Sequence, residues 1–147
     1  MDKKEIRIIT ANILVLVIAI LGVLIFRRIF VTTLVSGKSM EPNFTENQIV
    51  MMHIFLNLDR FDCVMIKSEK QLFKRVIGLP GETIEYKDNK LYVNGVEIED
   101  KYAQGKTENF KIILAENEYF CMGDNREISK DSRALGPFKR EQIKAKM

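Results

Sequence analysis

Two short segments of this 147-residue chain hold side chains that could perform nucleophilic chemistry. Ser39 lies in the run Ser-Gly-Lys-Ser-Met-Glu-Pro, between a glycine and a proline, where the chain is expected to turn. Lys74 lies in the apolar run Leu72–Ile77, which ends at the turn sequence Gly-Leu-Pro-Gly. A serine hydroxyl is a weak nucleophile until a base removes its proton, and an uncharged amine can act as that base. These residue types suit catalysis at a carbonyl, provided that the fold brings them together.

The environment of Lys74 decides whether its amine can be uncharged. The pKa of a lysine, about 10.4, must fall by roughly three units, which requires about 4–5 kcal/mol of preference against the charged form. Burial among apolar groups can lower the pKa by that much. The neighbouring apolar side chains are Leu72, Phe73, Val76 and Ile77. Alternation along a strand lets only some of them face the amine. The alternative is a solvated lysine at a sheet edge, where its charge discourages strand pairing.

A third segment, Gly123–Arg133, is polar and follows the apolar run Tyr119–Met122. Its carboxylates, basic groups and hydroxyls alternate at a spacing that allows them to bond one another. We therefore expect a rigid turn that positions other groups. The alternative is a charged surface loop.

Histidine, cysteine and metal chemistry receive less support. His53 is the one histidine, so a Ser-His-Asp triad is arithmetically conceivable, but its strand-like surroundings favour a histidine on a strand surface. Cys63 and Cys121 lie in apolar, strand-like runs, which favours buried thiols; a disulfide stays open, because the sequence does not show whether they meet. No ligand spacing indicates a metal, and no cofactor is expected.

Together the three segments resemble the type I signal peptidases, the membrane-anchored Ser–Lys proteases that remove signal peptides from exported proteins, in their short Gram-positive-like form. The matching strings are the serine segment, Lys-Arg-Val-Ile-Gly-Leu-Pro-Gly and Gly-Asp-Asn-Arg-x-x-Ser-x-Asp-Ser-Arg, with a weaker fourth at Arg60–Met65. The resemblance implies a mainly β fold, in which one transmembrane helix precedes a compact coiled β-sheet catalytic domain. It also implies a serine endopeptidase that acts through an acyl-enzyme.

The resemblance further implies roles for individual residues. Ser39 would be the nucleophile and Lys74 the general base, and the Ser39 N–H and the region of Gly37 would surround the oxyanion. The remaining positions would orient the dyad, brace the loop or line the substrate pocket: Ser129 bonded to the lysine amine, Asp124 paired with Arg75, Asp131 and Arg133 bracing Ser129, Met40 beside the lysine, and Val35 and Phe73 in the pocket.

The chain departs from the family's pattern at several positions. The serine segment commonly continues Pro-Thr but here continues Pro42-Asn43, and the lysine segment commonly ends in aspartate but here ends in Glu82. Some members place a serine hydroxyl at the position of Gly37, so the second oxyanion donor stays open. The bulk of Phe73 leads us to expect a narrow pocket. The substrate range could be narrower than general secretion, for example one class of surface protein or pilin.

Residues 8–26 contain no charge, and as a helix they would span about 28 Å, close to the hydrocarbon thickness of a bilayer. The alternatives are a cleaved signal peptide, for which the run is long and lacks a small-residue cleavage site, and a buried core helix, although the run is apolar on every face. We expect a cytoplasmic tail over 1–7, a transmembrane anchor over 8–26 and a catalytic domain over 27–147. The charge bias is slight, so the extracytoplasmic placement of that domain, on a single-pass protein of the cell membrane, follows from the resemblance.

Beyond the anchor, alternating apolar and polar residues between turn signals predict short strands. Asn94-Gly95 indicates a hairpin, and residues 99–109 are expected to form a loop. The predicted strands are Gln48–Phe55, Phe61–Lys67, Leu72–Ile77, Thr83–Tyr86, Lys90–Val93, Val96–Ile98, Phe110–Leu114, Glu118–Met122 and a final strand over Ile143–Met147.

The net charge of +3 arises at the N-terminus, because residues 1–28 hold five basic and two acidic residues and the rest of the chain holds 18 of each. A neutral body offers no basic surface for nucleic acid. The expected partners are signal-peptide-bearing preproteins, membrane lipid and the secretion machinery.

Three other functions are alternatives to the protease. A self-cleaving repressor-type protein also uses a Ser–Lys dyad, but the anchor and the neutral body disfavour it. A non-proteolytic accessory protein in surface-protein or pilus assembly could lose its dyad, whereas Ser39 and Lys74 are both present. A plain membrane-anchored β domain would leave the matching strings unexplained.

Overall fold

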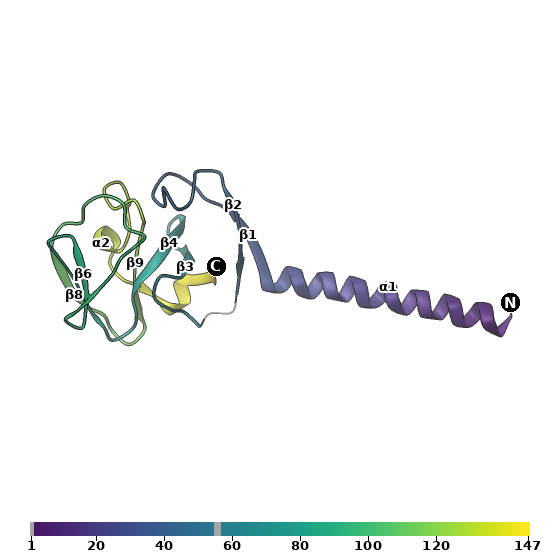
Figure 1. Ribbon diagram of the computed structural model, residues 1–147. Helices are drawn as coiled ribbons and strands as arrows, with labels where there is room; N and C mark the ends of the chain where they lie inside the picture. The colour runs from purple at the N-terminus through teal and green to yellow at the C-terminus, as the bar shows by residue number, and fades with distance from the viewer. Residues whose placement is uncertain (1, 55–56) are drawn as a thin grey trace.

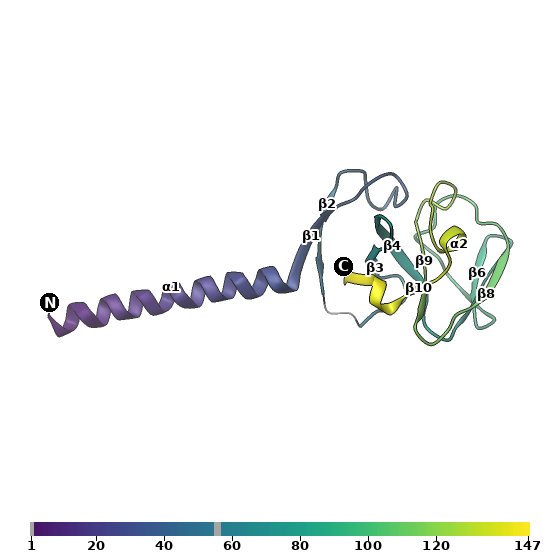
Figure 2. The same cartoon turned by 180° about the vertical axis from the view of Figure 1, so that it is seen from behind.

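A long helix, α1 (Lys3–Ile29), projects from a β-rich body in this computed structural model, which describes residues 2–54 and 57–147 (Figures 1 and 2). The most apolar 18-residue window of α1 has a mean hydropathy of 3.0, and none of it is buried within the protein. By length and composition α1 could therefore cross a membrane. The helix extends beyond residues 8–26 at both ends and takes in most of the expected polar tail.

Helix α1 runs directly into β1 (Phe30–Leu34), a strand that the sequence analysis did not predict. The rings of Phe26 and Phe30 stack across the junction, with centroids 4.5 Å apart. Strand β1 pairs antiparallel with β2 (Ile49–His53). The strand was missed because its five residues, Phe-Val-Thr-Thr-Leu, do not alternate between apolar and polar. The predicted strand Gln48–Phe55 is shorter in the structure, and its end at Phe55 lies outside the described residues.

The strands of the described residues form two sheets. The larger has the order β1-β2-β11-β3-β4-β9-β10, and the smaller has the order β7-β6-β5-β8. The remaining bounds are β3 (Cys63–Lys67), β4 (Gln71–Gly78), β5 (Thr83–Lys87), β6 (Lys90–Val93), β7 (Val96–Ile98), β8 (Phe110–Ile113), β9 (Glu118–Met122), β10 (Phe138–Lys139) and β11 (Ile143–Lys146). A short helix, α2 (Ser132–Leu135), follows β9, and a single 3₁₀ turn (Arg140–Gln142) joins β10 to β11.

The predicted strands are present, with ends that differ by one or two residues, so the mainly β architecture is confirmed. One difference has a clear cause. Phe61 lies before β3 rather than in it, because its φ of +73° turns the chain and its N–H donates to the carbonyl of Val76 at 2.7 Å. The elements that the sequence analysis missed after β1 are α2 and β10, which are too short to show a periodic pattern.

Strand β4 is an inner strand of the larger sheet and is buried on both faces from Phe73 to Gly78. It pairs with β3 on one side and β9 on the other. Side chains that alternate along β4 therefore all enter the protein interior, whichever face they occupy. This burial applies to Lys74 and Arg75 as well as to their apolar neighbours.

The two cysteines are free and buried, as expected for thiols in strand-like apolar runs. Cys63 on β3 is in register with Arg75, and Cys121 on β9 is in register with Val76. Consecutive residues of β4 point to opposite faces, and β3 and β9 lie on opposite sides of β4, about 9–10 Å apart. This arrangement is too wide for a disulfide.

Candidate functional site

Ser39 and Lys74 meet in the folded chain. The Nζ atom of Lys74 lies 2.6 Å from the Oγ atom of Ser39 and also donates to the carbonyl oxygen of Phe73 at 3.2 Å. Ser39 is half-buried, in the connection between β1 and β2, whereas only 4% of Lys74 is exposed. Ser39 thus keeps part of its surface exposed, while the amine of Lys74 is sheltered from water.

Burial lowers the pKa of Lys74 below its ordinary value, because a charged amine loses most of its hydration at this position. Nearby groups act in both directions. The carboxylates of Asp131 and Asp124 raise the pKa, as does Cys121, and the guanidinium of Arg133 lowers it. The loss of hydration outweighs these charges, so the structure favours the uncharged amine more than water does.

The turn that holds Ser39 is anchored by a buried apolar cluster. Its ends are joined by hydrogen bonds between Val35 and both Gln48 and Asn47, at 2.9 and 2.8 Å. Met40 is fully buried in the cluster, with Val35 and Phe73, and the remaining members are Phe44, Val50, Met52, Cys63 and Ala145. The expected pocket residues Val35 and Phe73 and the expected packing residue Met40 are therefore together beside the dyad.

Gly37 lies two residues before Ser39 with a φ of +75°, a left-handed backbone conformation that favours glycine. Nothing lies within 4 Å of the position that its Cβ would occupy. A serine side chain would fit the space but strain the backbone, which accounts physically for glycine at this position.

The segment Gly123–Arg133 forms the braced turn that its composition predicts. Asp131 accepts hydrogen bonds from the N–H of Gly123 at 3.0 Å and from the Nε and Nη2 atoms of Arg133 at 2.9 and 2.8 Å. Burial by itself raises the pKa of the Asp131 carboxyl, but these hydrogen bonds outweigh it and hold the pKa below its ordinary value. Asp131 is thus a carboxylate that fixes the start of the turn.

Gly123 is the point where this turn touches the serine segment. The N–H of Asn125 donates to the carbonyl of Ser39 at 3.0 Å. A Cβ at Gly123 would overlap the Oγ atom of Ser129 and would lie 2.5 Å from the carbonyl oxygen of Ser39. Only a residue without a side chain allows the two backbones to approach this closely.

Ser129 packs against Gly123, close to the Ser39 carbonyl, and does not bond the amine of Lys74. Its Oγ atom is buried and falls short of hydrogen-bond geometry with any described residue, although it lies near Asp131 and helps to lower the pKa of that carboxyl. Arg133 reaches the Ser129 carbonyl at 3.4 Å. Ser129 also borders an open cavity of about 880 Å³ between residues 106–112 and 126–134, which neither Ser39 nor Lys74 lines.

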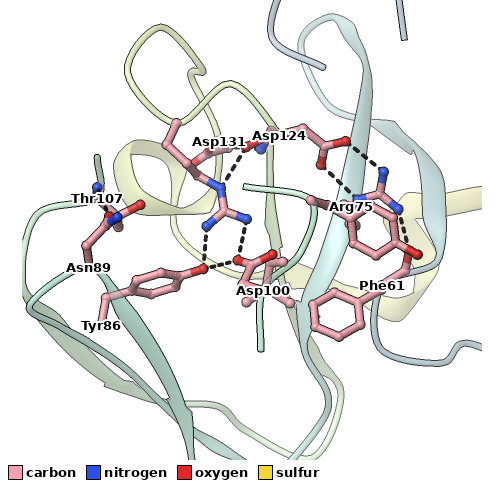
Figure 3. Close-up of polar contacts among 12 residues, drawn as sticks. Phe61, Arg75, Tyr86, Asn89, Asp100, Thr107, Asp124 and Asp131 are labelled. Atoms are coloured by element: carbon pink, nitrogen blue, oxygen red, sulfur yellow. Dashed lines mark hydrogen bonds and ion pairs between the residues drawn. The ribbon is translucent and has the colours of Figure 1, made fainter. Parts of the chain in front are cut away.

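Asp124 and Arg75 form the expected ion pair, which is joined by two hydrogen bonds. The Nε and Nη2 atoms of Arg75 donate to the two carboxylate oxygens of Asp124 at 2.8 and 2.7 Å (Figure 3). Both side chains are buried. Burial opposes the charge of Arg75, but the hydrogen bonds to Asp124 and the surrounding groups outweigh it and raise the pKa of Arg75. The pair joins the turn Gly123–Arg133, called the polar turn below, to β4, the strand that holds Lys74.

The sequence analysis missed two groups of residues around this pair. Asn43 and Tyr102 lie against Arg75 and Asp124, and Arg126 is fully buried with Asp100 and Tyr86, two of the residues labelled in Figure 3. Arg126 stood within a recognised string without an assigned role, and Asn43 was noted only as a departure from the family's pattern. Tyr102 lies in a stretch assigned as loop and gave no signal.

The chain is similar to known proteins over most of its length. The family model described as signal peptidase, peptidase S26, matches residues 7–147. The protein named signal peptidase I V of Bacillus subtilis (strain 168) is 36% identical over 146 residues, which cover 84% of this chain and 87% of that protein. Signal peptidase I of Streptococcus pneumoniae serotype 4 is 32% identical over 175 residues, covering 87% of this chain and 86% of that protein.

A solved structure gives the same result for the fold. A signal peptidase I from Enterococcus faecalis V583 is similar with a TM-score of 0.58 at 32% sequence identity, covering 63% of this chain and 97% of that chain. Sequence and fold thus point to one group of proteins, and this chain belongs to the signal peptidase family, peptidase S26.

Proposed function

We propose that this protein is a signal peptidase I, a serine endopeptidase that removes signal peptides from exported preproteins with Ser39 and Lys74 as its catalytic dyad. The observation that supports this most directly is the distance of 2.6 Å between Lys74 Nζ and Ser39 Oγ, at a lysine whose pKa burial lowers. A neutral amine has two hydrogens and one lone pair. It can therefore donate to the Phe73 carbonyl and accept the proton of the Ser39 hydroxyl at the same time.

Acylation follows from these contacts. Ser39 Oγ attacks the carbonyl carbon at the end of the signal peptide as Lys74 takes its proton. The tetrahedral intermediate collapses when the resulting ammonium gives that proton to the leaving amine of the mature protein. The backbone N–H of Ser39 is one donor to the oxyanion, and the region of Gly37 borders the same space.

Deacylation again uses Lys74 as the base, now towards water. The uncharged Lys74 takes a proton from water, whose oxygen attacks the ester carbon, and Lys74 then returns the proton to Ser39 Oγ. The contacts between Asp131, Arg133 and the Gly123 N–H keep the turn beside the dyad in place through both steps. Ser129 would orient the amine only if its hydroxyl moved from its present position or acted through a bridging group.

We place the catalytic domain, residues 27–147, outside the cytoplasm, with residues 8–26 spanning the membrane and residues 1–7 within the cell. Strand β1 follows α1 directly, so the turn between β1 and β2 that holds Ser39, called the serine turn below, comes shortly after the apolar helix along the chain. The precursor would bind as an added strand, with small side chains before the cut placed against Val35 and Phe73. The membrane lipid and the secretion machinery would be its other partners.

The test is cleavage of a signal-peptide-bearing precursor by the detergent-solubilised full chain. Ser39→Ala and Lys74→Ala should each abolish cleavage, whereas Lys67→Ala, which removes an exposed lysine of β3, should leave it unchanged. The rate of the unsubstituted protein should rise towards alkaline pH as Lys74 loses its proton. Cleavage that survives Ser39→Ala or Lys74→Ala, or that does not depend on pH, would exclude this dyad. A chain that binds the precursor without cutting it would instead support the accessory function.

A further inference from the structure

Asn43 joins the serine turn to the polar turn through its side-chain amide. Its Nδ2 atom donates to the Oδ2 atom of Asp124 at 2.9 Å and to the backbone carbonyl of Tyr102 at 3.1 Å. Asn43 itself is exposed, but Asp124 is fully buried, so the amide reaches into the interior. An amide nitrogen has two hydrogens, and both are used here.

These contacts close a ring around the dyad. Ser39 touches Lys74, Arg75 is the next residue along β4, and Arg75 is held in two places by Asp124. Asp124 in turn accepts from Asn43, which stands four residues after Ser39. The nucleophile and the base are therefore linked twice, once by their own contact and once through Asn43.

The second acceptor of Asn43 belongs to a segment that covers the Arg75–Asp124 pair. The ring of Tyr102 lies over the guanidinium of Arg75, with 3.7 Å between the guanidinium carbon and the ring centroid. Two residues further on, the N–H of Gln104 donates to the Asp124 carbonyl at 2.7 Å. Asn43 is thus the side chain at which the serine turn, this covering segment and the polar turn are joined.

We propose that Asn43 is a positioning residue, whose amide holds the serine turn so that the Ser39 hydroxyl stays within hydrogen-bond distance of the Lys74 amine. The inference rests on the proposed function and extends it to a residue that touches neither the substrate nor the reacting atoms. A threonine at this position would have one hydroxyl hydrogen and could make only one of the two bonds.

The expected effect of Asn43→Ala is on the chemical step. The turn would lose its link to Asp124, and a displacement of about 1 Å can reduce the rate of a chemical step about a hundredfold. We expect kcat to fall about ten- to a hundredfold and KM to change less than about twofold, since Asn43 itself is not among the buried residues of the apolar cluster that holds Val35 and Phe73.

The pH profile supplies an independent readout. The groups that act on the Lys74 amine are Asp131, Asp124, Cys121 and Arg133. Without the Asn43 amide, the Asp124 carboxylate has one donor fewer and favours the charged amine more strongly. The alkaline rise of kcat should therefore move to higher pH in Asn43→Ala. A side chain that served only the stability of the fold would not move this rise.

The experiment measures kcat, KM and the pH profile for Asn43→Ala, Asn43→Thr and Gln48→Ala, alongside the unsubstituted protein and Ser39→Ala. Gln48 is the matched control, because its exposed amide accepts from the N–H of Thr45 in the same turn at 3.0 Å and does not reach Asp124. Asn43→Thr should fall between the unsubstituted protein and Asn43→Ala, and it also decides the question if Asn43→Ala does not fold. Cleavage by the unsubstituted protein that is lost in Ser39→Ala establishes the proposed function separately.

The proposal is overturned if Asn43→Ala, or Asn43→Thr where the alanine variant does not fold, retains kcat within about twofold of the unsubstituted protein. A loss confined to KM, an unchanged pH profile or an equal loss in Gln48→Ala would overturn it as well.

Discussion

Replacing Lys74 by methionine should abolish cleavage and at the same time stabilise the folded protein near neutral pH. A methionine has a similar length and no charge to hydrate, whereas 96% of the lysine is removed from water. Each unit by which burial lowers the pKa of Lys74 corresponds to about 1.4 kcal/mol of unfavourable free energy in the charged form. We expect a net gain on the order of 1–4 kcal/mol, the range found when buried charges give way to apolar groups, less the cost of two lost contacts, to Ser39 and to the Phe73 carbonyl.

The pH dependence of this gain follows from proton linkage. The pKa of Lys74 is lower in the folded protein than the ordinary 10.5 of the unfolded chain, so the unfolded chain binds more protons between the two values. The free energy of unfolding of the unsubstituted protein therefore rises with pH across that window. The advantage of Lys74→Met should be largest below the folded pKa and should disappear above pH 10.5.

The assay is urea unfolding of the detergent-solubilised chain, followed by far-ultraviolet circular dichroism at several pH values. Lys67→Met, which removes an exposed lysine of β3, is the control and should change the free energy of unfolding by less than about 0.5 kcal/mol. A Lys74→Met protein that is less stable than the unsubstituted one at acidic pH, or whose difference is the same at every pH, would refute a lysine destabilised by burial.

Three further predictions concern the surroundings of the dyad. Asp124→Ala should cost about 3–5 kcal/mol in urea unfolding, because it leaves the charge of Arg75 buried without its partner, and adding Arg75→Met should recover part of the loss. Gly123→Ala should lower kcat in the cleavage assay, since a Cβ there would overlap the neighbouring serines, whereas Gly22→Ala in α1, with nothing within 4 Å of the new Cβ, should not. Phe73→Ala should allow cleavage after residues larger than alanine and should cost about 3–5 kcal/mol of stability; unchanged selectivity would remove Phe73 from the pocket.

Much of the fold could be predicted because local signals and tertiary structure agree. The hairpin turn at Asn94-Gly95 has positive φ at both residues, as such a tight turn requires, and joins β6 to β7. The uncharged run in α1 is apolar on every face and stays unburied within the protein. Strand β1 lacks an alternating pattern of its own and is defined by its pairing with β2.

The site was predictable in its members and less so in its contacts. The pairing of Asp124 with Arg75 and the contact of Asp131 with Arg133 are present as the family resemblance implied. The expected bond between Ser129 and Lys74 is absent among the described residues: the Ser129 hydroxyl packs against Gly123, and the Lys74 amine bonds Ser39 and the Phe73 carbonyl. Asn43 gave no signal of its own, since its partners are 59 and 81 residues away.

By itself, the order of residue types determined which groups are available for catalysis, that an apolar helix precedes a β domain, and where most strands lie, because these properties depend on neighbours along the chain. Tertiary structure alone decided that β4 is buried on both faces, which lowers the pKa of Lys74, and that the serine turn folds over it to leave 2.6 Å between hydroxyl and amine. Desolvation and distance depend on segments that are remote in sequence, and no local pattern specifies them.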